Sequence, residues 1–434
     1  MSGKASELVV DLDAASLQSS VRTRLRTEVG QGKVFVVRGA LQALGLLAEL
    51  RAATIEGAGR VAGPAAAERL EAEGFEHVHE VVPGADIPDV MRAATAAHAA
   101  IAPALAKRIC RFLLGPGHLY LEEPPNVRFH VPYDATRSIE DLGSPEFSGR
   151  ITPHGPHHDS WYYCPTNGVD VWMALGPVTR GNGLSIYPEA DGRILPCDDR
   201  GVVRRDQSFG PPVNFEMDPG DILVFAGEHL HSSEINSTSL TRHVVSYRIS
   251  LDRPQFVGNS PYGHRYRYLA ASDGRAGALA ERASVLIGRA RRSVDRRLGR
   301  ANTTRWVVSA AEVDGFDAMP ARHGLVDDVD DLLADDEASA AQVAARLELE
   351  PGSVRAVSER LCAARTEGGD VVVFRRSCPH QGADLASGYV EGSTLHCPWH
   401  NLPIDLGTGA SPCRTLRHIG IERRWSSEVA DRAR

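Results

Sequence analysis

Two short cysteine–histidine pairs near the C-terminus are the residues whose types and spacing indicate chemistry most directly. Cys378 and His380 form the first pair, and after sixteen residues Cys397 and His400 form the second. Two loops that each supply one thiolate and one imidazole can hold an iron–sulfur cluster, with the thiolates on one iron and the imidazoles on the other. This mixed ligation raises the reduction potential above that of an all-cysteine cluster, so the pattern predicts an electron carrier.

Zinc is the alternative ion for these four side chains, because sets of two cysteines and two histidines are common zinc sites. A zinc finger usually presents a cysteine pair and then a histidine pair, whereas each half here carries one of each. The order C-x-H followed by C-x-x-H resembles the Rieske ferredoxin motif. Further matches to that motif are Gln381 to Ala383, Gly388 and Asp405 to Gly409.

The Rieske resemblance implies a 2Fe-2S cluster with one iron bound by Cys378 and Cys397 and the other bound by His380 and His400. One departure from the motif is visible: the glycine that often follows the second histidine is Asn401 in this chain. We expect this change to alter local solvent exposure or partner docking and to leave ligation intact.

A second group of metal-type side chains lies upstream. His157 and Asp159 are two residues apart, His231 follows His157 by 74 residues, and Arg242 comes eleven residues later. Two histidines and one carboxylate on one face of a β-barrel form the facial triad of non-haem iron(II) oxygenases, which leaves positions open for a co-substrate and O₂. Residues two apart on a strand share a face, so His158 is expected to point away. The Arg242 guanidinium suits bidentate capture of a carboxylate.

The complete upstream pattern, with Asn236 five residues and Arg242 eleven residues after His231, resembles the phytanoyl-CoA dioxygenase-like branch of the iron(II)/2-oxoglutarate oxygenases. The resemblance implies that His157, Asp159 and His231 bind Fe(II). It also implies that Arg242 holds the distal carboxylate of the co-substrate 2-oxoglutarate. The retained Asp159 argues against a halogenase, because related halogenases replace this carboxylate by a small residue.

Several nearby residues keep open roles. His229 is an alternative distal ligand, ranked lower because the Asn and Arg spacings count from His231. His154 and His158 are either structural or close to the substrate. The remaining open residues are Arg128 and His130, which either face into the barrel or lie on a surface strand, and Trp161, Tyr162 and Trp172, which are core or pocket wall.

Composition sets broader limits. Of the 434 residues, 42% are hydrophobic and 24% are charged, as in ordinary globular proteins. The net charge of −8 argues against a nucleic-acid partner, so we interpret the arginine-rich stretch 275–305 as a solvated linker helix. No apolar run approaches the about 20 residues that cross a membrane. Seven cysteines, an odd number, and an N-terminus without a signal-peptide pattern favour a cytoplasmic location.

The predicted fold is mainly β with N-terminal helices: a double-stranded β-helix (jelly roll or cupin-like), followed by a small all-β Rieske domain. We expect an oxygenase domain over residues 1–270 with its barrel core at about 118–252, a charged linker over 271–342 and the Rieske domain over 343–434. Apolar residues at helical spacing predict helices at Leu41–Ala53, Ala65–Glu73 and Val90–Leu114, whereas 169–175, 221–225, 243–249, 353–357, 361–365 and 371–374 have the character of strands.

Residues 338–364 are ambiguous, because apolar residues near helical spacing also resemble a helix-turn-helix. We prefer strands there, since Pro351 and Gly352 interrupt the run.

The two resemblances together predict an oxygenase that hydroxylates, desaturates or cyclises a small molecule, in secondary-metabolite or amino-acid biosynthesis in a bacterium. The expected partners are this substrate, O₂, and a ferredoxin reductase or another electron donor for the cluster. The Rieske domain would then re-reduce iron(III) after uncoupled turnover or supply electrons for an atypical outcome. One alternative is a Rieske-type oxygenase that receives electrons through the cluster and uses no 2-oxoglutarate. Another is an oxygenase whose Rieske domain is a non-catalytic redox sensor or docking module.

Overall fold

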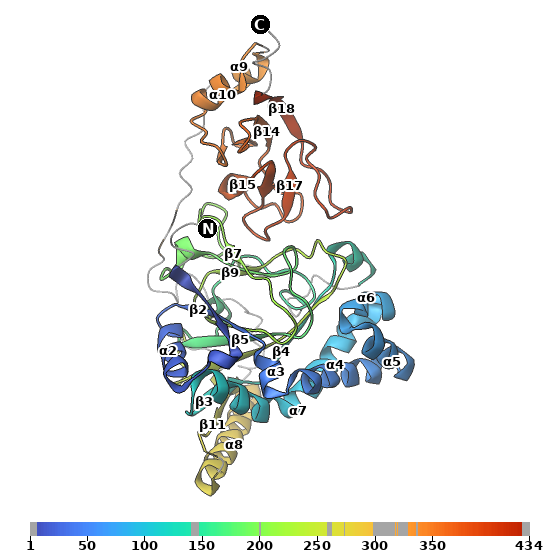
Figure 1. Ribbon diagram of the computed structural model, residues 1–434, viewed down its shortest axis with the longest axis vertical. Helices are drawn as coiled ribbons and strands as arrows, with labels where there is room; N and C mark the ends of the chain where they lie inside the picture. Colours follow the sequence, from blue (N-terminus) through green and yellow to red (C-terminus); the bar gives the residue numbers. More distant parts are fainter. Residues whose placement is uncertain are drawn as a thin grey trace.

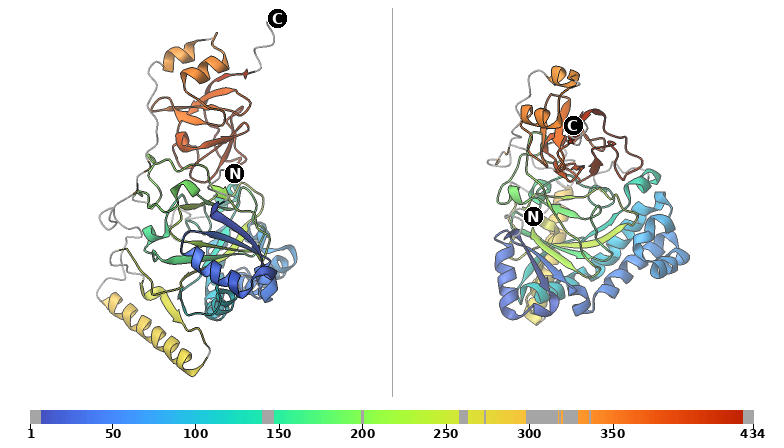
Figure 2. Two further views of the ribbon diagram at one scale, coloured as in Figure 1. Left: turned by 60° about the vertical axis from the view of Figure 1, so that its left-hand side comes forward. Right: turned by 45° about the horizontal axis from the view of Figure 1, so that its top comes forward.

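The computed structural model describes residues 7–139, 147–198, 201–257, 263–272, 274–297, 317, 319, 329–335 and 337–427. A β-barrel with helices on one side forms the larger part, and a smaller β module formed by the C-terminal residues sits on one end of it (Figures 1 and 2). Among the described helices, none is both long enough and apolar enough to cross a membrane.

The barrel consists of a large sheet and a small sheet. The large sheet runs in the order β1 (Val9–Asp13), β2 (Val34–Arg38), β8 (Ile222–Ala226), β5 (Gly168–Ala174), β10 (Arg242–Ser250), β3 (Leu119–Glu122) and β11 (Tyr266–Leu269), with β4 (Asn126–His130) also paired to β10. The small sheet runs β7 (Val213–Asn214), β6 (Leu184–Ile186), β9 (His231–Ser233). Apolar side chains from both sheets, among them Trp172, Ile186 and Phe225, form one buried cluster.

Strand β10 shows how the sequence positions the interior. Val245, Tyr247 and Ile249 belong to the buried cluster that also contains the helices' apolar side chains. Because side chains alternate along a strand, Arg242 and Arg248 lie on the opposite face, toward the barrel interior. A strand that is buried on both faces and still carries arginines places charge inside the barrel, where only paired charge is stable.

The N-terminal helices cover the outer face of the large sheet. They are α2 (Ser19–Val29), α3 (Ala40–Leu44), α4 (Leu47–Ala62), α5 (Pro64–Glu73), α6 (Val78–Val81) and α7 (Ile87–Leu114). Helices α4 and α7 touch at Gly57, where an added Cβ would lie 2.4 Å from the Ala94 Cα, so only glycine permits this close approach. The three predicted helices are confirmed, although α3 and α4 divide the first.

Short 3₁₀ turns connect these elements. They are η1 (Ala14–Ser16), η2 (Phe75–His77), η3 (Gly84–Asp86), η4 (Tyr133–Ser138), η5 (Asp159–Tyr162), η6 (Pro188–Ala190), η7 (Gly263–Arg265) and η10 (Leu385–Ser387). Of these, η5 matters most, because the candidate ligand Asp159 is its first residue.

The arginine-rich stretch begins as helix α8 (Arg275–Arg297), as the sequence predicts. It is anchored to helix α7 by the Lys107–Glu281 ion pair, at the end opposite the C-terminal module (Figure 1). Leu279, Leu286 and Ile287 are exposed on it. The rest of the predicted linker, up to residue 328, lies outside the described residues except for 317 and 319.

The C-terminal module contains two sheets and two short helices. Its elements are α9 (Val329–Ala334), α10 (Ala340–Arg346), a sheet of β12 (Val354–Ala356), β13 (Leu361–Arg365), β14 (Val371–Arg375) and β18 (Ile421–Trp425), and a sheet of β15 (Tyr389–Glu391), β16 (Thr394–His396) and β17 (Pro403–Asp405). The predicted fold class, a mainly β chain with N-terminal helices and a small all-β module, is confirmed.

The preference for strands throughout 338–364 is wrong at its N-terminal end, where α10 forms. Ser339 and Gln342 make a reciprocal capping box that starts this helix. Strands begin only at Val354, after the Pro351-Gly352 interruption.

Candidate functional site

His157 and His231 face each other across an isolated antiparallel bridge. The His157 N–H donates to the His231 carbonyl at 2.9 Å, and the His231 N–H donates to the His157 carbonyl at 3.0 Å. Residues directly opposite in such a pair project to the same side. Their ring centroids are consequently only 4.2 Å apart, although the two residues are 74 positions apart in sequence.

The backbone also selects which ring nitrogen of each histidine is free. His157 Nδ1 hydrogen-bonds the Gly155 carbonyl and His231 Nδ1 hydrogen-bonds the His229 carbonyl, each at 2.8 Å. A carbonyl only accepts, so both Nδ1 atoms carry the proton and both Nε2 lone pairs are available to a metal. Burial lowers the pKa of His231 to about 4 and that of His157 well below its usual range, so both rings are neutral at pH 7.

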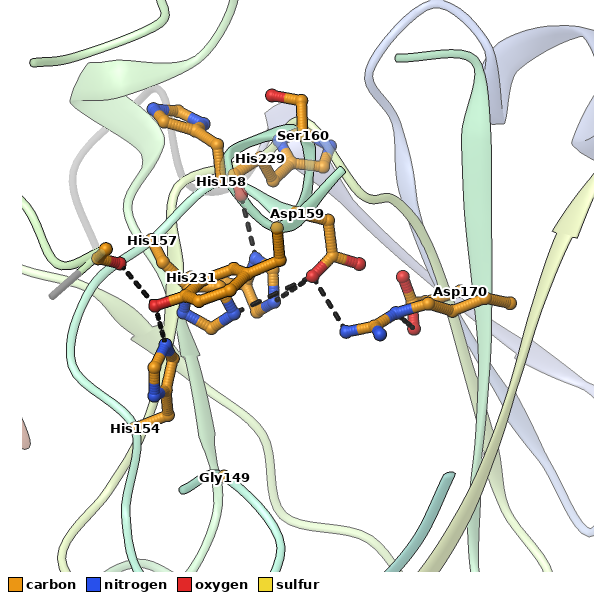
Figure 3. A network of polar contacts seen from close by, with 12 residues as sticks. Gly149, His154, His157, His158, Asp159, Ser160, Asp170, His229 and His231 are labelled. Atoms are coloured by element: carbon orange, nitrogen blue, oxygen red, sulfur yellow. Dashed lines mark hydrogen bonds and ion pairs between the residues drawn. The ribbon is translucent and has the colours of Figure 1, made fainter. Parts of the chain in front are cut away.

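Asp159 completes the group. Its Oδ1 lies 3.7 Å from His157 Nε2 and 3.9 Å from His231 Nε2, and one candidate ligand atom from each of the three buried residues lies within 4.8 Å of the others (Figure 3). The Asp159 N–H donates to the Gly227 carbonyl, and an added Cβ at Gly227 would lie 3.1 Å from the Asp159 Cβ. Two imidazoles and one carboxylate fit a non-haem iron(II) ion.

Arg248 holds the carboxylate from the barrel side. Its Nη2 donates to Asp159 Oδ1 at 2.8 Å, and the same guanidinium lies 3.6 Å from Asp170 and 3.7 Å from Glu122. Arg248 is not among the site residues predicted from the sequence. The available signal was its position six residues after Arg242 on one strand, which puts both side chains on the inner face.

The other histidines have different surroundings. His158 Nδ1 bonds the Glu228 carbonyl and its Nε2 accepts from the Leu195 N–H, so this ring is saturated and turned away from the triad, as expected. His229, the lower-ranked alternative ligand, faces Asp191 at 3.3 Å. His154 packs edge-on against the His157 ring, with centroids 4.2 Å apart, and hydrogen-bonds Ser148 and Tyr162.

Arg242 and Arg128 carry buried charge inside the barrel. Arg242 Nη1 donates to the Asn182 and Gly183 carbonyls at 2.7 and 2.6 Å, and its guanidinium lies over the Trp172 ring. The Nε atoms of both arginines are buried without a hydrogen-bond partner. Burial, followed by the Arg128 charge, lowers the pKa of Arg242 to about 9, and the Glu234 charge opposes this shift only in part. A dicarboxylate ligand beside the guanidinium would therefore stabilise its buried charge.

The open residues from the sequence are thereby placed. Val244 on β10 pairs with Arg128 and Arg242 pairs with His130 on β4, so the inward-facing alternative holds for both Arg128 and His130. Trp161 is buried in a cluster shared with the C-terminal module, and Trp172 is buried in the barrel.

The four Cys and His residues of the C-terminal module come together on two loops. The first loop follows β14 and closes with the Cys378 N–H bonded to the Ala383 carbonyl, and the second joins β16 to β17 with the Cys397 N–H bonded to the Leu402 carbonyl. The His380 and His400 rings lie 4.8 Å apart, and His380 Nδ1 is buried without a partner.

The protonation of these groups also suits a cluster. The hydrogen bond with Cys397 lowers the pKa of the Cys378 thiol, while burial raises that of Cys397. Burial lowers the pKa of His380 to about 4, and that of His400 is also well below its usual range, so both imidazoles are neutral ligands at pH 7. Two thiols beside two neutral imidazoles fit a Rieske cluster.

Family models match both parts of the chain. Residues 141–244 match the phytanoyl-CoA dioxygenase (PhyH) model, and residues 338–416 match the Rieske [2Fe-2S] domain model. The chain therefore joins a phytanoyl-CoA dioxygenase-like segment to a C-terminal Rieske domain, and both resemblances seen in the sequence are confirmed.

Two curated relatives match different parts. A probable phytanoyl-CoA dioxygenase of Caenorhabditis elegans is 26% identical over 129 residues, which are 26% of this chain and 41% of the relative. An anthranilate 1,2-dioxygenase ferredoxin subunit of Burkholderia cepacia is 31% identical over 64 residues, 15% of this chain and 59% of the relative. The chain thus spans about half the length of either relative.

Among solved structures, the non-haem α-ketoglutarate-dependent epimerase SnoN from nogalamycin biosynthesis is 19% identical, and the match covers 56% of this chain and 88% of SnoN with a TM-score of 0.33.

Proposed function

We propose that this protein is an iron(II)- and 2-oxoglutarate-dependent oxygenase that oxidises a C–H bond of a small molecule, with the Rieske domain as its source of single electrons. The observation that carries the proposal is the buried triad of His157, Asp159 and His231, whose two Nε2 atoms are left free by the backbone. When bound, the iron(II) would activate O₂, which is the oxidant, and 2-oxoglutarate would supply two of the four electrons that reduce it, the C–H bond supplying the other two.

The chain's own residues have separate tasks in this scheme. His157, Asp159 and His231 hold the ion, and Arg248 fixes the Asp159 carboxylate so that its orientation is set before the ion binds. Arg242 binds the distal carboxylate of 2-oxoglutarate, and its hydrogen bonds to Asn182 and Gly183 orient the guanidinium. The barrel buries all three ligand side chains, which limits the access of bulk water to the ion.

The electron balance assigns the Rieske domain a supporting task. Two electrons from 2-oxoglutarate and two from the C–H bond already reduce one O₂, so a productive cycle needs none from the cluster. A single electron becomes necessary when a turnover without substrate leaves iron(III). We therefore assign Cys378, His380, Cys397 and His400 to a cluster that restores iron(II), supplied by a ferredoxin reductase or another one-electron donor.

The test is anaerobic reconstitution with iron and sulfide, followed by O₂ with and without 2-oxoglutarate while succinate is measured. Succinate that requires 2-oxoglutarate, His157, Asp159, His231 and Arg242 is the expected result. Absence of succinate in a protein with an intact cluster would overturn the 2-oxoglutarate assignment and favour an oxygenase fed only through the cluster.

The substrate class follows by analogy. A small molecule of a bacterial biosynthetic pathway is our proposal, with hydroxylation as the default outcome and desaturation or ring closure as variants. Product analysis by mass spectrometry with ¹⁸O₂ distinguishes hydroxylation from the other two outcomes, because only hydroxylation leaves the label in the product, and NMR of an unlabelled product distinguishes a double bond from a ring.

A further inference from the structure

The second cluster loop is bonded to the barrel by three of its residues. The Tyr187 hydroxyl donates to the Pro398 carbonyl, the Ile235 N–H donates to the His400 carbonyl, and the Asn401 side-chain amide donates to Glu234 Oε1, each at 2.8 Å. All three barrel residues are buried. The loop that carries the second cysteine and histidine is therefore seated on the barrel.

Apolar packing continues this contact. Trp399 and Leu402 of the loop belong to one buried cluster with Trp161, Leu230 and Ile235 of the barrel. At its edge, Asp134 accepts hydrogen bonds from Thr415 and Arg414, and Arg180 pairs with Glu391. A shared apolar core sets a fixed orientation between the two parts, because separating them would expose it to water.

The seating brings the histidine of the cluster loop close to the triad. His400 Nε2 is buried without a partner, and it lies 3.9 Å from the position that a Cβ on Gly155 would occupy. The Gly155 carbonyl accepts the Nδ1 hydrogen bond of the triad's His157. One short backbone segment therefore separates an imidazole of the cluster motif from an imidazole of the triad.

Asn401, the departure from the usual glycine, explains how the loop is clamped. Its φ of 51° lies in the left-handed region that favours glycine, and asparagine tolerates this region better than most residues. In exchange the side chain accepts from the Tyr389 hydroxyl and donates to Glu234. The same Glu234 carboxylate accepts from the Gly181 and Gly183 amides, so the clamp is anchored in barrel backbone.

We propose that the segment from Gly155 to His157 is an intramolecular electron bridge, and that Asn401 and Tyr187 are positioning residues that hold His400 against it. This inference rests on the electron supply proposed above. The step moves one electron from the reduced cluster to iron(III), so the cluster is oxidised, the triad's iron becomes iron(II), and no bond is made or broken. A one-electron donor outside the chain then reduces the cluster again.

With this bridge, the electron passes from the cluster to the triad's iron within a single chain. Because electron transfer weakens steeply with distance, a cluster held beside the triad's own loop exchanges faster than one that must collide with another molecule. With His400 covered by the barrel and His380 half-buried beside Tyr133, an external donor must approach the cluster from another side.

The test uses the full chain with both sites loaded and oxidised, without O₂ or 2-oxoglutarate. One electron per chain is added from dithionite, and freeze-quench EPR follows the reduced-cluster signal and the iron(III) signal over time. We expect the two signals to decay together, at a rate that stays constant over about a tenfold range of protein concentration.

Two variants weaken the clamp without touching a ligand. Asn401→Gly restores the usual residue and removes the bond to Glu234, and Tyr187→Phe removes the bond to Pro398. Each should slow the decay about tenfold or more, the range known for lost outer-shell contacts, while the absorption spectrum and potential of the cluster stay unchanged. Glu391→Gln, which alters the exposed rim pair with Arg180 and a 3.5 Å contact with His396 but neither bond of the clamp, is the matched control and should keep the wild-type rate.

A decay rate proportional to protein concentration, or wild-type rates in both variants, would overturn the bridge while leaving electron supply intact. A reduced cluster that never reduces iron(III) would overturn electron supply itself, together with the bridge. Succinate formation in the same preparation would then still support the 2-oxoglutarate oxygenase.

Discussion

The two candidate metal centres are built in contrasting ways. The cluster loops are local: each closes on itself with two backbone hydrogen bonds, and they are separated by two short strands. The triad depends on a bridge between residues 74 positions apart and on arginines from the far strand β10. A local centre tolerates loss of distant packing, whereas the triad exists only when the whole barrel closes.

Removing a triad ligand should have the largest effect. His231→Ala removes one of three ligands, and we expect 2-oxoglutarate-dependent succinate formation to fall by more than about 100-fold, since the loss of outer-shell partners alone costs 10–100-fold. The cluster's absorption spectrum should be unchanged, because its ligands lie elsewhere. His229→Ala is the matched control; equal loss in both variants would contradict the choice of His231.

Removing a cluster ligand should separate the roles of the two centres. In Cys378→Ser we expect the first turnover to proceed normally and the total number of turnovers to fall several-fold, because iron(III) is no longer reduced. Succinate measured at substoichiometric and at saturating 2-oxoglutarate checks this. No first turnover would indicate an oxygenase driven by the cluster, and an unchanged total would indicate a sensing or docking module.

Arg242→Lys tests the carboxylate site with the charge retained. The planar fork is lost, and a charged hydrogen bond contributes about 1.5–3 kcal/mol, so the KM for 2-oxoglutarate should rise about 10–100-fold. Iron content should be unchanged. If Arg128→Lys raises KM and Arg242→Lys does not, then Arg128 is the anchor for the co-substrate.

Acid should weaken the helix–sheet layer of the barrel through His98, which is fully buried and hydrogen-bonded to Thr54. Burial lowers its pKa to about 4, so between about pH 6.5 and 4 the unfolded chain binds more protons than the folded one. The contribution of neutral His98 to the free energy of unfolding is complete above pH 6.5. As the pH falls, up to about 3 kcal/mol of it is lost.

Urea unfolding of the metal-free chain, followed by circular dichroism between pH 4 and 7, measures this dependence. His98→Gln should reduce the slope of this dependence, to which other buried histidines such as His231 also contribute, whereas the exposed His118→Gln should leave the slope unchanged. An identical pH dependence in all three proteins would contradict the assignment.

The contrast between the local cluster loops and the non-local triad also decides how much could be predicted from the sequence. The cluster motif is contained in one short stretch, so its spacing and its resemblance to the Rieske motif were enough to predict its four residues and its fold. His157, Asp159 and His231 were also found, because their spacing and the asparagine and arginine after His231 form a family pattern. Arg248 was missed, since its pairing with Asp159 depends on which strand of the barrel faces the triad.

The contact between the two parts lay beyond sequence reasoning for a physical reason. Asn401 was recognised as a departure, with docking or exposure as its expected effect, but its partner Glu234 is 167 positions away and the pairing arises only when two separate folds meet. The helix α10 was likewise missed because a capping box at Ser339 decided a segment whose apolar spacing suited both structures.

The most direct test of the central claim is the iron and labile sulfide content of the reconstituted chain. We predict about three irons and two sulfides per chain, from one mononuclear ion and one [2Fe-2S] cluster. His231→Ala should lose one iron and no sulfide, and Cys378→Ser should lose two irons and both sulfides. Zinc without sulfide in the C-terminal module, or loss of all iron in both variants, would contradict two distinct iron sites in one chain.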